Sequence, residues 1–270
     1  MNNKKLKEIT ESNRAAWNQA TEYHQRARNN SLQIGFANPD FTTFDRDCDD
    51  VLIEKLQQMN ISGKTIAQLP CNNGRELLSL MRFGAKEAIG FDISDVAIME
   101  AKQLAEVSGL NAKFERINIP EIDNKYNNYF DFIYISEGSL QWFPDLNVYF
   151  SVVSRLLKKN GEILIFEMHP FAYFFENRNI DENQNFENII SYFDKVPHTY
   201  TKGLDYIGGV QYEAKKCYWF MHKMSDIINA ILQNGIEIKE FNEYNLEMAN
   251  NEAIIHLDKF PLSYILIGKK

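Results

Sequence analysis

The feature that most constrains the fold is a regular alternation of short apolar runs with helical patterns between residues 64 and 168. The apolar runs are continuous, which is typical of strands buried on both faces of a sheet. Because parallel strands need crossover connections and these are right-handed, the alternation predicts an α/β fold with a doubly wound sheet. The expected strands are 65–69, 87–92, 112–116, 130–136 and 162–168, and the expected helices between them are 75–83, 94–108 (closed by Gly109) and 147–157 (closed by 158–161).

Further patterns flank this region on both sides. Two helices are expected before it, and a helix and two strands after it, so the sheet should have seven strands and be mostly parallel. The last two strands can pair antiparallel. The expected helices are 4–30, 47–59 and 224–233, the expected strands are 236–244 and 263–269, and residues 31–46 are expected to form a loop.

The alternation stops between residues 170 and 222, a segment rich in tyrosine, phenylalanine and tryptophan. This segment is too long for a simple connection and too apolar for a disordered one. An aromatic run is usually core, but its place directly after the fifth strand equally favours an insertion that packs over one end of the sheet.

Composition narrows the classes of partner. Lysine and arginine number 29 against 37 aspartates and glutamates, a net charge of −8 without a basic cluster, so nucleic acid is not expected as a ligand. No apolar stretch approaches the roughly 20 residues of a membrane helix, and the first residues lack a signal-peptide core. We therefore expect a cytoplasmic protein without a membrane partner. Cys48, Cys71 and Cys217 are far apart, which makes a structural metal site unexpected.

The first strand–turn–helix is the first place to look for a site, because ligands of doubly wound sheets bind at the carboxyl ends of the strands. A tight turn between Gln68 and Glu76 would present backbone N–H groups there. Pro70 has no N–H, however, and only Gly74 lacks a side chain that could block a ligand. Taken alone, the segment is better explained as an ordinary strand–helix turn.

Asp92 gives a second signal, since it ends the second strand about 20 residues after the turn, where such folds bind ribose hydroxyls. A carboxylate can accept hydrogen bonds from both hydroxyls. The alternative is that Asp92 caps the next helix. Because Ser94 or Asp95 could serve as that cap, we favour the ribose role.

The run from Lys64 to Pro170 resembles class I S-adenosylmethionine-dependent methyltransferases in the order and spacing of its motifs. The first loop of that family reads acid-x-Gly-x-Gly-x-Gly, and here Gln68, Pro70, Asn72 and Gly74 occupy those places, so the acid and two glycines are missing. A bacterial branch of the superfamily has a similar degenerate loop. Other motifs similar to that branch are Asn13–Asn18, Leu140–Leu146 and Glu167–Pro170.

The resemblance implies S-adenosylmethionine as cofactor and a role for each matching position. Asp92 would hold the ribose diol and Ile93 would lie against the adenine. Asn118 and the N–H of Ile119 would meet the adenine amino group. Ser136, with the two residues after it, would lie under the methionine part. The methionine chain would pass along Leu69, Pro70, Cys71, Asn72 and Gly74, and Tyr23 and Arg28 would close over the cofactor or, equally, belong to a solvated helix face.

Catalytic candidates follow from the chemistry of methyl transfer, which needs position, a dry pocket and a base only if the nucleophile must lose a proton. His169 is the best-placed titratable group and Glu137 the next. Trp142 and His222, with the aromatic insertion, would line a mostly apolar substrate pocket. Each of these residues could instead be structural.

We therefore expect a methyltransferase that acts on a small molecule, as a monomer or homodimer. A rival interpretation, supported by the degenerate loop, is a non-catalytic protein that binds S-adenosylmethionine or S-adenosylhomocysteine. A nicotinamide oxidoreductase is less consistent, because Gly-x-Gly-x-x-Gly is absent. The expected division is an N-terminal helical lid (1–62), a cofactor-binding core (63–169), an inserted substrate cover (170–222) and a C-terminal helix and strands that complete the sheet (223–270).

Overall fold

A computed structural model describes residues 3–174, 190–200, 203–248 and 259–270. Seven strands form one sheet in the order β3-β2-β1-β4-β5-β9-β8. β1 to β5 pair in parallel, and β9 runs antiparallel to both β5 and β8. This confirms the predicted doubly wound, mostly parallel sheet. The strands are β1 (Thr65–Gln68), β2 (Glu87–Asp92), β3 (Ala112–Arg116), β4 (Phe130–Ile135), β5 (Leu157–Met168), β8 (Glu237–Tyr244) and β9 (Ser263–Lys269).

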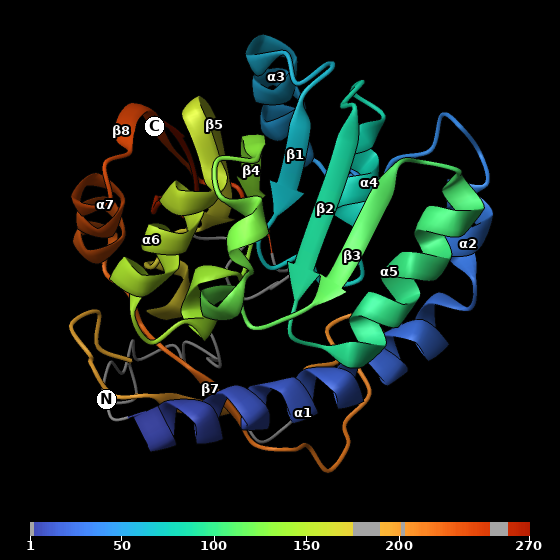
Figure 1. Ribbon diagram of the computed structural model, residues 1–270. Helices are drawn as coiled ribbons and strands as arrows, with labels where there is room; N and C mark the ends of the chain where they lie inside the picture. The colour runs from blue at the N-terminus through green and yellow to red at the C-terminus, as the bar shows by residue number, and fades with distance from the viewer. Residues whose placement is uncertain (1–2, 175–189, 201–202, 249–258) are drawn as a thin grey trace.

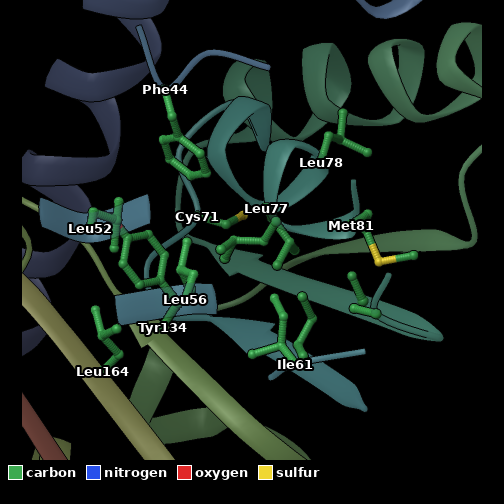
Figure 2. Packing of buried hydrophobic residues seen from close by; sticks show 14 of the residues in the cluster. Phe44, Leu52, Leu56, Ile61, Cys71, Leu77, Leu78, Met81, Tyr134 and Leu164 are labelled. Atoms are coloured by element: carbon green, nitrogen blue, oxygen red, sulfur yellow. The ribbon is translucent and has the colours of Figure 1, made fainter. Parts of the chain in front are cut away.

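Helices cover both faces of this sheet, because successive residues of each buried strand point to opposite sides. On one face, Ile66 packs with α3, α4 and α5 in the cluster that Figure 2 shows in part. On the other face, Ala67 packs with α6 and α7. The helices are α1 (Asn3–Arg28), α2 (Ser31–Phe36), α3 (Asp49–Met59), α4 (Arg75–Met81), α5 (Asp95–Ser108), α6 (Leu146–Leu156) and α7 (Met224–Gln233), with short 3-10 turns at Ile119–Glu121, Asn124–Tyr126, Leu140–Trp142 and Ala172–Phe174.

α1 lies outside these layers. It crosses beneath the arrowheads of β1, β2 and β3, at the carboxyl ends of the strands (Figure 1). It contacts α5 on one side and the short strand β7 (Cys217–Trp219) on the other. The edge of the sheet where a ligand is expected therefore faces a helix from the N-terminus of the chain.

Two local predictions were wrong, at residues 31–36 and 158–161, and the aromatic segment has strands that were not predicted. Residues 31–36 form α2 instead of a loop, because Leu32 and Phe36, one helical turn apart, are buried in the first core cluster. The expected helix closure at 158–161 belongs to β5, because the Asn160 N–H and the Gly161 carbonyl pair with Lys270 at the chain end. The aromatic segment contains a hairpin of β6 (His198–Tyr200) and β7.

The remainder of the predicted insertion, at 175–189 and 201–202, lies outside the described residues. Within the described ranges, no helix has the length and apolar character that a membrane crossing requires.

Candidate active site

A cavity of about 930 Å³ lies at the carboxyl ends of β1, β2 and β4. Its walls come from the loops after these strands, from α1 and from the aromatic segment. Ten of the predicted site residues line it: Pro70, Cys71, Asn72, Asp92, Ile93, Asn118, Ile119, Ser136, Glu137 and Trp142.

The degenerate loop after β1 keeps a tight turn despite its missing glycines. Asn72, at one glycine position, has φ +48°, a left-handed conformation that asparagine tolerates better than most residues. Gly74 has φ +74° and precedes the first residue of α4. A Cβ on Gly74 would lie 2.5 Å from the ring of Phe114, so only glycine fits there. The loop therefore passes close under the cavity without the usual sequence.

Two residues of this loop support the turn and do not line the cavity. Leu69 is fully buried, and its carbonyl accepts a hydrogen bond from the Tyr149 hydroxyl. Gly74 is enclosed by the Phe114 ring. Both were predicted as cofactor contacts, and the structure instead places them one layer behind the cavity wall.

Asp92 is buried at the end of β2 and faces the cavity. Its two carboxylate oxygens accept the N–H groups of Asn72 and Ser94, each at 2.8 Å. The Ser94 hydroxyl caps α5 by accepting the Ala97 N–H, so Asp92 is not needed as the cap. Burial raises the pKa of Asp92, and the backbone donors oppose that shift. A carboxylate oxygen can accept more than one hydrogen bond, so each retains capacity for a ligand hydroxyl.

The loop after β3 forms the wall beside Asp92. Asn118 and Ile119 line the cavity there, as does Ile93 from the loop after β2. The Asn118 side chain also donates a long hydrogen bond, 3.4 Å, to Glu121. Two apolar side chains and an amide thus lie next to the carboxylate, which suits a flat heteroaromatic ring.

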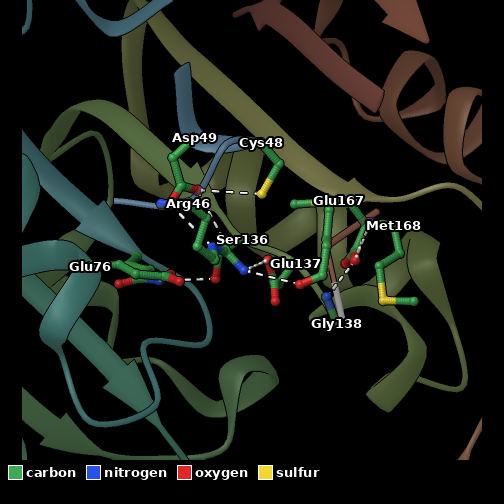
Figure 3. A network of polar contacts seen from close by, with 11 residues as sticks. Arg46, Cys48, Asp49, Glu76, Ser136, Glu137, Gly138, Glu167 and Met168 are labelled. Carbon is green, nitrogen blue, oxygen red and sulfur yellow. Dashed lines mark hydrogen bonds and ion pairs between the residues drawn. The ribbon is translucent and has the colours of Figure 1, made fainter. Parts of the chain in front are cut away.

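Glu137 follows β4 and lies in a cluster with two residues from before α3 and at its start (Figure 3). Arg46 donates to Glu137 at 2.7 Å and to both oxygens of Asp49. Burial raises the pKa of Glu137 to about 7, while the Arg46 guanidinium opposes the shift. A carboxyl group with this pKa can take up or release a proton near neutral pH.

The backbone around Glu137 is fixed by Glu167 at the end of β5 (Figure 3). Its carboxylate accepts the backbone N–H groups of Gly138, Ser139, Leu140 and Met168. Burial nevertheless raises the pKa of Glu167 to about 7. This side chain is part of the motif that the sequence singled out, and it holds the loop instead of facing a ligand.

α1 and the aromatic segment form one cover over the cavity. The buried Asn13 amide bonds both the N–H and the carbonyl of Tyr218, at 2.7 and 2.8 Å. The Trp17 ring of α1 packs edge to face against the Trp142 ring, with the ring centroids 5.2 Å apart. The centroid of the Tyr200 ring lies 6.4 Å from that of Trp142. All three aromatic side chains line the cavity and make its end near the N-terminus of α1 apolar.

The structure places both predicted histidines away from this cavity. His169 is buried, its Nδ1 accepts the Phe171 N–H, and its Nε2 lies 3.0 Å from Glu243. His222 Nε2 is 2.8 Å from the Phe143 carbonyl, beside a separate, smaller hollow near α7. Because neither ring reaches the cavity, the catalytic assignment of His169 and the substrate assignment of His222 are corrected to structural roles.

Tyr23 and Arg28 are on α1 as expected, but they do not line the cavity. Tyr23 stacks on Tyr212 at 4.1 Å. The Arg28 side chain is 9% exposed, and its guanidinium lies 3.6 Å from the carboxylate of Glu100 of α5. Both tie α1 to its neighbours, so a direct contact with the cofactor is replaced by a role in holding the cover.

Several residues of the cavity wall were missed by the sequence reasoning. Arg46 lies in a segment without periodicity, and no pattern linked it to Glu137. Arg75 and Glu76 directly follow the first loop, which was the one available signal. Trp17 and Tyr206 come from segments that were predicted to cover the site, although these two residues were not singled out.

Residues 61–235, more than half of the chain, match the family model described as a methyltransferase domain. The chain belongs to the methyltransferase domain family. This confirms the predicted resemblance to a methyltransferase family.

Similar proteins support the same family. A ribosomal protein L11 methyltransferase from Vibrio parahaemolyticus is 35% identical over 63 residues, 23% of this chain and 21% of that protein. A tRNA U34 carboxymethyltransferase from Campylobacter fetus is 28% identical over 107 residues, 40% of this chain and 37% of that protein. The chain thus spans well under half the length of these curated relatives.

Solved structures share the fold. An S-adenosylmethionine-dependent methyltransferase from Mesorhizobium loti superposes with a TM-score of 0.59 at 20% identity, covering 80% of this chain and 96% of that one. Geranyl diphosphate C-methyltransferase from Streptomyces coelicolor, solved with geranyl diphosphate and S-adenosylhomocysteine, has a TM-score of 0.55 at 12% identity, covering 82% and 79%.

Proposed function

We propose that this protein transfers a methyl group from S-adenosylmethionine to a small molecule held between the sheet edge and the cover. The observation that carries the proposal is Asp92, a buried carboxylate that is oriented by two backbone N–H groups and faces the cavity. Such a carboxylate suits a vicinal diol, because each of its oxygens can accept one hydroxyl.

The cavity wall fits the remainder of the cofactor. Ile93 and Ile119 can sandwich the adenine, and Asn118 can bond its amino group. Pro70, Cys71 and Asn72 border the path toward Ser136, where the methionine part would lie. When bound, the cofactor supplies a methyl group on a sulfonium centre. This chain's residues then have to position the acceptor and keep water out.

Glu137 is the candidate general base. It lies in the cavity wall, and its pKa of about 7 allows the carboxylate to accept a proton at neutral pH. Arg46 holds the carboxylate in one orientation through a 2.7 Å contact. An acceptor hydroxyl or amine placed against Glu137 would lose its proton to this group as the new bond to carbon forms.

A small acceptor is favoured by the cover. Trp17, Trp142 and Tyr200 give the acceptor end of the cavity aromatic walls. The contacts between α1 and residues 213–218 cross this end, where a protein or RNA chain would need an open path. The geranyl diphosphate C-methyltransferase of similar fold was solved with a small molecule, geranyl diphosphate, and S-adenosylhomocysteine bound.

The test is transfer of labelled methyl groups from S-adenosylmethionine to three acceptor sets: small hydroxyl and amine compounds, ribosomal protein L11, and tRNA. The proposal expects label only in the small-molecule set. Label in L11 or tRNA would contradict the acceptor class. Cofactor binding without transfer to any set would favour the non-catalytic alternative.

A further inference from the structure

The cavity wall next to Ser136 contains the carboxylate of Glu76. We propose that Glu76 binds the α-ammonium group of the cofactor's methionine end, in place of the acid that is missing at Gln68. The inference rests on the proposed function, because it concerns the same cofactor, and it assigns a role to a residue outside the recognised motifs.

Gln68 and Glu76 are joined directly. The Gln68 amide donates to one Glu76 carboxylate oxygen at 2.7 Å and to the Ser136 hydroxyl at 3.0 Å. Gln68 is 1% exposed and does not line the cavity, whereas Glu76 and Ser136 do. The amide at position 68 therefore acts as a support that fixes the carboxylate one layer nearer to the ligand.

The hydrogen bonds of this pair are incomplete in a way that fits a cation. The buried Gln68 carbonyl oxygen has no donor, and no residue in the described part of the chain donates to the second Glu76 oxygen. An ammonium group has three N–H donors and no acceptor. A ligand of that kind in the cavity could donate to the second oxygen of Glu76, which lines the cavity.

The charges around the pair favour Glu76 over its neighbour. Glu137 is also in this wall, but Arg46 neutralises it at 2.7 Å. Within the described ranges, no lysine, arginine or histidine pairs with Glu76, and no carboxylate pairs with Arg75 beside it. A methionine end carries both an ammonium and a carboxylate, and Arg75 with Glu76 presents the two opposite charges next to each other.

The experiment compares two nucleosides that share the adenosine thioether and differ at its end. S-adenosylhomocysteine has the amino acid group, and methylthioadenosine lacks it. Calorimetry should measure both affinities for the native protein, for Glu76→Gln and for the control Glu106→Gln, an exposed residue of α5. We expect Glu76→Gln to weaken S-adenosylhomocysteine at least 10-fold and methylthioadenosine less than twofold.

A charge swap keeps the inference testable if the single change disturbs the loop. The double variant Gln68→Glu with Glu76→Gln retains an amide–carboxylate pair and returns the acid to the usual family position. It should recover most of the lost affinity for S-adenosylhomocysteine.

An unchanged affinity for S-adenosylhomocysteine in Glu76→Gln, or a folded swap variant without recovery, would overturn the role of Glu76 alone. A native protein that binds neither nucleoside would overturn the proposed function and this inference with it.

Discussion

Three carboxylates at the sheet edge, Asp92, Glu137 and Glu167, differ in their partners. Asp92 meets two backbone N–H groups and the cavity, Glu137 meets Arg46 and the cavity, and Glu167 meets four backbone N–H groups only. A group whose acceptor capacity is filled by the backbone holds the loop. A group that retains free capacity toward the cavity is available to a ligand.

Glu137 should make the reaction pH-dependent. Because the carboxylate form is the base and the pKa is raised to about 7, kcat/KM should rise as the pH increases from 6 to 8. Glu137→Gln should lower kcat/KM about 10²- to 10⁴-fold and remove this rise, since an amide accepts no proton. Initial rates across that pH range check the prediction. An unchanged rate and profile in the variant would exclude Glu137 as the base.

Glu167→Gln should destabilise the fold. Both oxygens of Glu167 accept hydrogen bonds from backbone N–H groups. In Glu167→Gln an NH2 group replaces one oxygen, and because it is a donor it cannot accept the bonds of those N–H groups. Leaving buried donors unsatisfied costs about 1–3 kcal/mol each. Urea unfolding at pH 8, with Glu106→Gln as control, should show a loss of that size. A variant as stable as the control would refute the supporting role.

At the scale of elements, α1 and the aromatic segment depend on each other. α1 bonds the backbone of residues 213–218 through side-chain amides, at Asn13 in a buried position and at Gln19 in an exposed one. On its other side α1 is held to α5 by Asn18 and Arg14, which both bond Asp95. The cover is therefore anchored to the core through α1.

These two amides give a matched comparison. Asn13→Ala would leave the partly buried N–H and carbonyl of Tyr218 without a partner, whereas the exposed backbone groups bonded by Gln19 can bond water instead. We expect Asn13→Ala to lower the free energy of unfolding by about 1–3 kcal/mol and Gln19→Ala by less than about 1 kcal/mol. Protease cleavage within residues 213–218 should also become faster in Asn13→Ala only. Equal effects of both changes would mean that burial of this contact does not hold the cover.

At the scale of the whole molecule, the sheet followed from the sequence because its signals are local. Strands β2, β3 and β9 and helix α7 begin and end where their apolar patterns predict. The predictions were wrong where contacts with residues distant in the sequence determine the local structure. Residues 158–161 have the composition of a helix end, but their backbone pairs with Lys270 and so belongs to a strand. Helix α2 forms because its two apolar residues pack into a core built by other helices.

The site shows the same division. Asp92, Asn118 and Ser136 could be found because each follows a strand, and strand ends meet at one edge. His169 also follows a strand, but Phe171 and Glu243 turn its ring away from the cavity. Arg46 reaches Glu137 across the fold, and no sequence spacing encodes that contact. Glu76 contacts Gln68 across the first loop, and its place directly after this loop was the one available signal.

We propose above all that the Asp92 carboxylate accepts hydrogen bonds from the ribose hydroxyls of the cofactor. Calorimetric titration of S-adenosylhomocysteine into the native protein, Asp92→Ala and the exposed control Asp40→Ala tests it most directly, with a thermal melt to confirm folding. Two charge-assisted hydrogen bonds of roughly 1.5–3 kcal/mol each predict that Asp92→Ala binds S-adenosylhomocysteine at least ~100-fold more weakly. The affinity of the control variant should not change. A folded Asp92→Ala variant that binds within twofold of the native protein would contradict the account.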